Sequence, residues 1–175
     1  MINDIFDFLK LQPKGIEYYS KYPTALMFVI MLVLYIPYDF LFNVGGTNSS
    51  VNILSDIANS FIVTILEAYF LVYWLGRKEK KYSFSTVLDF NLLLSISVVI
   101  PLNLLGLLLL NFNSQSWAFL IISFIALVYA FYLVVVNLAL ACGVTKKYAL
   151  GGGLIIFLIQ LLADLTIFSN QQALA

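Results

Sequence analysis

The sequence contains no histidine and a single cysteine, Cys142, among its 175 residues. Without histidine, the chain lacks the side chain that most often transfers protons near neutral pH. One cysteine forms no disulfide within the chain and, with no histidine beside it, excludes most zinc sites. Only 10% of the residues are charged, and no basic face extends far enough to hold a nucleic acid. We therefore expect no enzymatic activity, no metal or other cofactor, and no nucleic-acid partner.

Apolar residues are what the chain has in abundance. They make up 62% of it, and the mean hydropathy is +0.99, far outside the usual range of soluble domains. A helix needs about 20 apolar residues to cross a hydrocarbon layer of about 30 Å. The sequence predicts an all-α integral membrane protein, a single bundle of five transmembrane helices that occupies residues 1–175. The predicted spans are roughly 24–42, 55–76, 86–110, 116–141 and 148–168.

The positive charges predict the orientation of this bundle. All nine Lys and Arg residues fall before the first apolar run, after the second or after the fourth: Lys10, Lys14, Lys21, Arg77, Lys78, Lys80, Lys81, Lys146 and Lys147. Cytoplasmic loops carry such an excess of bases. We expect a cytoplasmic N-terminus and an external C-terminus, most simply in a bacterial cytoplasmic (inner) membrane. The basic loop Arg77, Lys78, Lys80 and Lys81 has two interpretations, a topology anchor or a site for anionic lipid headgroups.

A short amphipathic helix is predicted in the cytoplasmic lead, residues 1–22. Apolar side chains recur there at helical spacing, at Ile2, Ile5, Phe6 and Leu9. The sequence Pro-Lys-Gly at 13–15 ends the pattern. We expect this helix, over about residues 2–11, to lie on the cytoplasmic interface of the membrane.

Polar and small side chains lie on one face of each predicted span. At 100° per residue, the polar residues of the second span fall within about 80° of one another, and a similar face in the fifth span contains Ala149 and Gly153. The third span carries Asn91 and Ser95 on one side. The candidate intramembrane polar cluster consists of Asp56, Ser60, Thr64, Glu67, Asn103, Asn137, Gln160 and Asp164. Because small and amide side chains let helices approach and hydrogen-bond, these faces are interpreted first as packing seams.

Glu67 supports a second interpretation. A carboxylate deep in a bilayer is costly, by about 2.5–3.5 kcal/mol on insertion scales, and usually faces a cavity or a partner. No Lys or Arg lies within any predicted span, so Glu67 has no cation to pair with. It is then neutral, hydrogen-bonded to Gln160, Asn103 or hydroxyls, hydrated in a pocket, or paired with another protein. A proton- or cation-linked cavity is the alternative to the packing seam.

Several segments together resemble the Yip-domain family of membrane proteins. They are Pro13 ahead of Ile16-Glu17-Tyr18-Tyr19, Tyr22-Pro23, Tyr82-Ser83-Phe84-Ser85, Pro101, and residues 143–150. The resemblance extends from about residue 8 to 168. It implies five spans, a cytoplasmic N-terminus and an external C-terminus. Eukaryotic members associate with Rab-type GTPases and vesicle traffic; without their long N-terminal region, this chain resembles a compact bacterial member.

Two functions are expected from these observations. The first is a non-enzymatic scaffold or membrane-organising protein of the Yip-domain kind, whose partners are membrane lipids and another membrane protein or a second copy of the chain. The alternative is a small transporter or proton- or cation-linked permease that uses Glu67 and neighbouring polar residues. A scaffold needs a packed interior, whereas a permease needs a hydrated path to Glu67.

Overall fold

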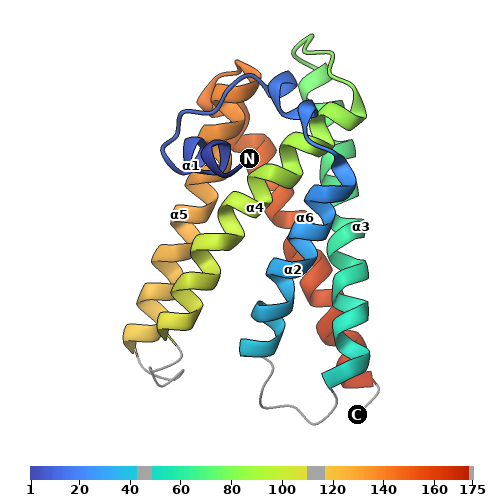
Figure 1. The fold of residues 1–175 in the computed structure, drawn as a ribbon, viewed down its shortest axis with the longest axis vertical. Coiled ribbons are helices and arrows are strands. Elements are labelled where there is room, and N and C mark those ends of the chain that lie inside the picture. Colours follow the sequence, from blue (N-terminus) through green and yellow to red (C-terminus); the bar gives the residue numbers. More distant parts are fainter. Residues whose placement is uncertain (43–48, 110–116, 174–175) are drawn as a thin grey trace.

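The computed structural model describes the backbone of residues 1–42, 49–109 and 117–173, with side chains over 1–34, 60–102, 104–105, 117–118 and 120–163. Over this part of the chain every regular element is helical (Figure 1). The elements are α1 (Ile2–Leu9), the 3-10 helix η1 (Ile16–Lys21), α2 (Thr24–Phe42), α3 (Ser49–Gly76), α4 (Phe84–Leu109), α5 (Trp117–Cys142) and α6 (Lys146–Ala173). An all-α fold was predicted from the sequence, and the described chain agrees with it.

The long helices match the predicted apolar runs closely at their basic ends. Helix α2 has the predicted bounds, whereas α3 begins at Ser49 and α6 continues to Ala173, beyond the predicted limits of 55 and 168. Polar residues at these two ends, such as Ser49 and Asn170, lie outside the apolar pattern. Hydropathy therefore underestimated the length of both helices.

Capping residues explain where the helices begin and end on the basic side. Ser83 Oγ accepts a hydrogen bond from the Thr86 backbone N–H at 3.2 Å, which is the standard cap at the start of a helix. After α5, Gly143 adopts a φ of 62°, and the Val144 N–H donates to the Ala139 carbonyl at 3.0 Å. A glycine in the left-handed conformation followed by this i→i−5 hydrogen bond is a Schellman motif, which ends α5 before the chain enters α6.

Helix α4 is the central helix of the bundle. Every residue from 87 to 94 is buried, so all sides of α4 are covered there. It packs against α1, η1, α2, α3 and α5. The enclosed stretch is apolar except for Asp89 and Asn91, which hydrogen-bond to Thr24 and Glu67. The core therefore lies around the first half of α4, near the basic loops.

Glycines at the start of α6 allow close contact with neighbouring helices. A Cβ atom on Gly153 would lie 2.8 Å from Val135 Cγ2 of α5, closer than real Cβ atoms come. One on Gly152 would lie 3.1 Å from Trp74 Nε1 of α3. The Trp74 ring also stacks on Tyr148, with ring centroids 4.8 Å apart. Small residues thus bring α3, α5 and α6 together at this end.

Three stretches of the described chain are long and apolar enough to cross a membrane. They are Phe84–Leu102, Leu120–Cys142 and Lys146–Ala163. Two further apolar stretches, Thr24–Leu34 in α2 and Ser60–Gly76 in α3, are shorter within the described side chains. The structure is therefore that of a membrane protein with at least these three candidate spans.

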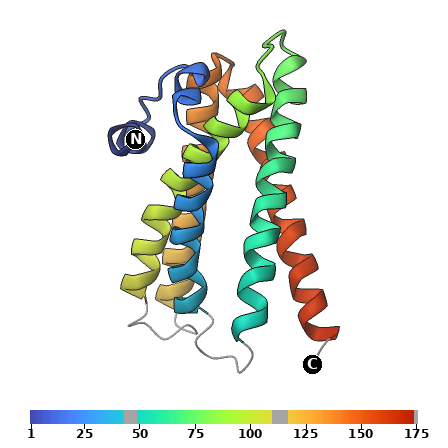
Figure 2. The same cartoon turned by 45° about the vertical axis from the view of Figure 1, so that its right-hand side comes forward.

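All the basic segments lie at one end of the bundle. Helix α1, η1, the 77–83 loop and the turn between α5 and α6 gather at the top of Figure 1, and α6 ends at the bottom. Figure 2 shows α1 end-on, to one side of the long helices near this end. Helix α1 packs there against α4 and α5. The chain thus begins at the basic end and runs to the other.

Candidate functional site

A cavity of about 330 Å³ lies among the five long helices of the described chain. Its polar lining comes from α3, α4 and α6, and α2 and α5 contribute apolar side chains. The polar residues that line it are Ser60, Thr64, Glu67, Asn91, Ser95 and Gln160. Apolar side chains form most of the remaining wall, among them Met31, Leu94, Val98, Phe131, Ile156 and Phe157. The volume is at the lower end of the range typical of small-molecule sites.

Glu67 is the deepest ionisable group of this cavity. The residue is only 2% exposed. Asn91 Nδ2 of α4 donates a hydrogen bond to Glu67 Oε2 at 2.9 Å. The side-chain amide of Gln160 also interacts with the carboxyl from α6, but Oε1 has no hydrogen bond of good geometry with the described groups. One oxygen of a buried carboxyl is thus left unsatisfied, which is unusual because buried polar atoms nearly always have a partner.

No base lines the cavity to balance this carboxyl. The nine Lys and Arg residues all belong to the N-terminal lead, the 77–83 loop or the first turn of α6, at one end of the bundle. Gln160 and Leu127, which line the cavity, are exposed, so protein does not enclose the cavity completely. The arrangement presents a carboxyl, two amides and hydroxyl groups to any solute that enters.

The predicted polar cluster separates into three parts in the structure. Ser60, Thr64, Glu67 and Gln160 line the cavity together. Asn137 does not line it. The side chains of three other predicted members, Asp56, Asn103 and Asp164, lie outside the part of the chain that the structure describes.

Asn137 holds the N-terminal helix instead. It is fully buried, and its Nδ2 donates to the Phe8 carbonyl of α1 at 3.0 Å and to the Leu133 carbonyl at 2.9 Å. The Phe8 carbonyl lies at the end of α1, where helix carbonyls lack partners within the helix. The sequence pattern placed Asn137 on a polar face but gave no sign that an N-terminal segment would occupy it.

Asn91 and Ser95 were missing from the predicted cluster. The sequence placed both on one face of the third span, at the i, i+4 spacing that aligns side chains along a helix. Nothing in that spacing said that this face of α4 meets Glu67 of α3. The partner of Glu67 was predicted to be Gln160, Asn103 or a hydroxyl, and the structure shows Asn91 in direct hydrogen-bonding contact.

The basic loop is open to its surroundings. Arg77, Lys78 and Lys81 are exposed, and Lys80 is half-buried. None of the four pairs with a carboxylate among the described side chains; the Lys78 ammonium lies 5.2 Å from the centre of the Tyr148 ring. The role of these charges, as a topology anchor or as a site for anionic headgroups, stays a prediction.

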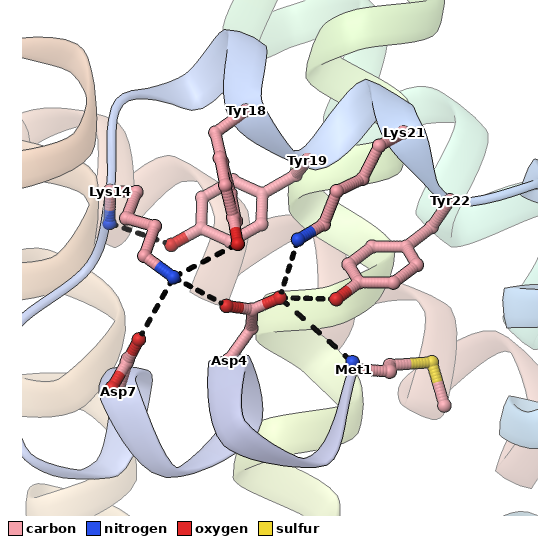
Figure 3. Close-up of polar contacts among 8 residues, drawn as sticks. All are labelled: Met1, Asp4, Asp7, Lys14, Tyr18, Tyr19, Lys21 and Tyr22. Carbon is pink, nitrogen blue, oxygen red and sulfur yellow. Dashed lines mark hydrogen bonds and ion pairs between the residues drawn. The ribbon is translucent and has the colours of Figure 1, made fainter.

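A second polar cluster surrounds Asp4 and attaches α1 to the bundle (Figure 3). Lys14 Nζ donates to Asp4 Oδ1 at 2.9 Å, and Lys21 Nζ lies 3.2 Å from Oδ2. The Tyr22 hydroxyl also donates to Oδ2, and the N-terminal ammonium lies 4.0 Å away. Both oxygens of this buried carboxylate are therefore satisfied.

The neighbours of Asp4 keep it ionised. Burial alone would raise the pKa of Asp4, but the hydrogen bond from Tyr22 and the ammonium groups of Lys14 and Lys21 outweigh it and hold that pKa well below its usual range. Burial raises the pKa of the nearby Tyr19 to about 12, so its hydroxyl stays neutral and accepts the Lys14 backbone N–H at 2.8 Å. This cluster is complete without a ligand and has a structural role.

The described side chains contain no group of three acids, cysteines or histidines that would hold a metal ion. No protein-family model, curated protein or solved structure matches this chain. The resemblance to the Yip-domain family stays a prediction. The cavity and its chemistry are therefore the features of the protein that bear on its function.

Proposed function

We propose that this chain spans the membrane five times, with its N-terminus and basic loops in the cytoplasm and its C-terminus outside. Two observations support this topology. All the bases lie at one end of the bundle, as the bias of cytoplasmic loops toward Lys and Arg requires. Helices α2 and α3 run alongside the three candidate spans, and their apolar stretches continue in sequence beyond the described side chains.

The function that the geometry supports best is that of a small proton- or cation-linked permease with its solute site at Glu67. The observation that carries this proposal is the cavity with an unsatisfied, buried carboxyl and no neighbouring base. Ionisable groups at this depth usually belong to ion or proton pathways. Nothing in the cavity pairs a nucleophile with a base, and we propose no enzymatic reaction.

The scaffold role predicted from the sequence remains the competing proposal. A scaffold needs a packed interior, and a cavity lies beside the polar faces of α3, α4 and α6, next to the contact of Asn91 with Glu67. The resemblance that suggested a scaffold has no independent support. We therefore prefer the permease. The two proposals also differ in what they require of Glu67.

Proton flux through the reconstituted protein tests this proposal. We expect liposomes that contain the wild-type chain to dissipate an imposed pH gradient faster than empty liposomes, as reported by a trapped pH-sensitive dye. Glu67→Gln should lower this flux about tenfold or more, because the amide keeps the size of the side chain but cannot carry a proton. Glu79→Gln is the matched control, since Glu79 is exposed in the basic loop.

The control should behave as the wild type. If Glu67→Gln also transports like the wild type, or if the wild-type protein adds no flux to empty liposomes, the permease is contradicted. A scaffold predicts the first of these results, because a neutral Glu67 in a packing seam is replaced by glutamine without consequence.

A further inference from the structure

The Glu67 carboxyl lacks two things that a ligand can supply. It has no protein cation to balance its charge, because no Lys or Arg lines the cavity. Its Oε1 atom also lacks a hydrogen bond of good geometry among the described residues, although the Gln160 amide interacts with the carboxyl. The other two buried acids of the described chain have no such oxygen: two lysines and a tyrosine surround Asp4, and Asp89, which has no ion pair, accepts a hydrogen bond from the Thr24 hydroxyl at 2.6 Å. The unsatisfied oxygen of Glu67, together with the cavity beside it, indicates that a partner of Glu67 comes from outside the chain.

A proton alone satisfies only half of this requirement. Protonation of Glu67 removes the charge, and the new hydroxyl then needs an acceptor on the wall, such as the amide oxygen of Gln160. A proton therefore neutralises the carboxyl but makes no use of the apolar wall of the cavity. A donor that also carries a positive charge satisfies Oε1 and balances the carboxylate, and charge-assisted hydrogen bonds of this kind are the strong ones.

We infer that the Glu67 cavity binds a protonated amine with a compact apolar body, whose ammonium group pairs with Glu67 Oε1. The inference rests on the proposed function and names the class of solute for the same site. An ammonium group offers three donors. Oε1 accepts one of them. The hydroxyl of Ser95 and the amide oxygen of Gln160 are further acceptors on the wall.

The rest of the wall fits the body of such a molecule. Phe131 and Phe157 lie edge to face, with their ring centroids 6.2 Å apart, and both border the cavity with Val98 and Leu94. These apolar side chains can contact the apolar body of a ligand and exclude water from it. A divalent metal fits less well, because calcium and magnesium need about six or more oxygen ligands and Glu67 is the one acid among the described residues of this wall.

The test compares two probes that differ in their charged group. Phenethylammonium and 2-phenylethanol share one apolar body, and the second replaces the ammonium with a hydroxyl. Binding is measured from the shift in melting temperature of the wild-type protein in nanodiscs at pH 7.5. We expect the amine to bind about tenfold or more tightly than the alcohol, as an ion-paired hydrogen bond requires. Equal affinities would overturn the inference that the solute is an amine, while the proposed solute site at Glu67 would stand.

Variants then assign the difference to Glu67. In Glu67→Gln the amine should lose its advantage over the alcohol, and in Glu79→Gln it should keep it. An undiminished advantage in Glu67→Gln overturns the inference. If that variant does not fold, the comparison of the two probes on the wild type decides alone. If neither probe binds, the inference is overturned, whereas proton flux that depends on Glu67 would leave the proposed function intact.

Discussion

Asp4 and Glu67 are almost equally buried, at 3% and 2% exposure, yet their surroundings differ. Asp4 has a lysine at each oxygen and the Tyr22 hydroxyl at Oδ2, so its charge stabilises the docked α1. Glu67 interacts with the amides of Asn91 and Gln160, has no cation, and has no hydrogen bond of good geometry at Oε1 among the described residues. An unpaired carboxyl costs stability when it is buried. At the scale of single residues, this contrast separates a structural acid from a candidate site.

The Asp4 cluster predicts how firmly the N-terminal helix is attached. Asp4→Asn removes the charge that Lys14 and Lys21 share, so residues 2–9 should detach about ten times more often, as seen in faster amide hydrogen exchange. Because the pKa of Asp4 is lowered, the stabilisation is complete above its ordinary pKa of about 4 and is lost as the pH falls below that value. Attachment of α1 should thus be constant from pH 5 to neutrality.

Glu17→Gln provides the control for this experiment, since Glu17 is exposed and its side chain forms no ion pair with described residues. It should leave the exchange of residues 2–9 unchanged. Exchange rates that are the same in Asp4→Asn and the wild type would show that Phe8 and Asn137 hold α1 without help from the charges.

At the scale of elements, the sequence predicted where the helices lie along the chain better than it predicted which helices pack against each other. Apolar length and capping residues are local, so hydropathy located α2, α4 and α5 closely. Which faces meet is decided by packing between helices distant in sequence. The amide of Asn137 lies 129 residues from Phe8, and no periodicity connects the two. The pairing of Glu67 with Asn91 was missed for the same reason.

The close contact of α5 and α6 gives a prediction about one glycine. Gly153→Leu should lower the melting temperature in detergent, with a loss of about 1–3 kcal/mol, because its Cβ would already lie 2.8 Å from Val135 Cγ2. Leu158→Phe, on the same helix at 50% exposure, should change the stability by less than about 0.5 kcal/mol. Equal melting temperatures for the two variants would place the contact face of α6 elsewhere.

At the scale of the whole molecule, charge and apolar length act together. The bases of three separate segments meet at one end of the bundle (Figure 1), and the cavity lies between the helices away from them. This separation keeps positive charge out of the Glu67 site. From the sequence, a cavity at Glu67 was predicted only as the alternative to a packing seam, since a polar face that packs and one that lines a cavity have the same pattern.

The proposed topology predicts the location of reporter fusions. Reporters at Asn48, Ser114 and Ala175 should be external, and those near Lys14, Lys80 and Lys146 should be cytoplasmic. Alkaline phosphatase and green fluorescent protein fusions distinguish the two sides. A cytoplasmic C-terminus would mean an even number of spans and would contradict the five-span proposal.

The central claim is that a water-filled cavity reaches Glu67, and thiol labelling at Thr64 tests it most directly. Thr64 lines the cavity, whereas Ala68, one turn further along α3, is fully buried and does not. With Cys142 replaced by alanine, a small cationic methanethiosulfonate should label Thr64→Cys at least about tenfold faster than Ala68→Cys, because a thiol needs water to ionise and react. Equal, slow labelling of both positions would contradict a hydrated cavity and favour the packed interior of a scaffold.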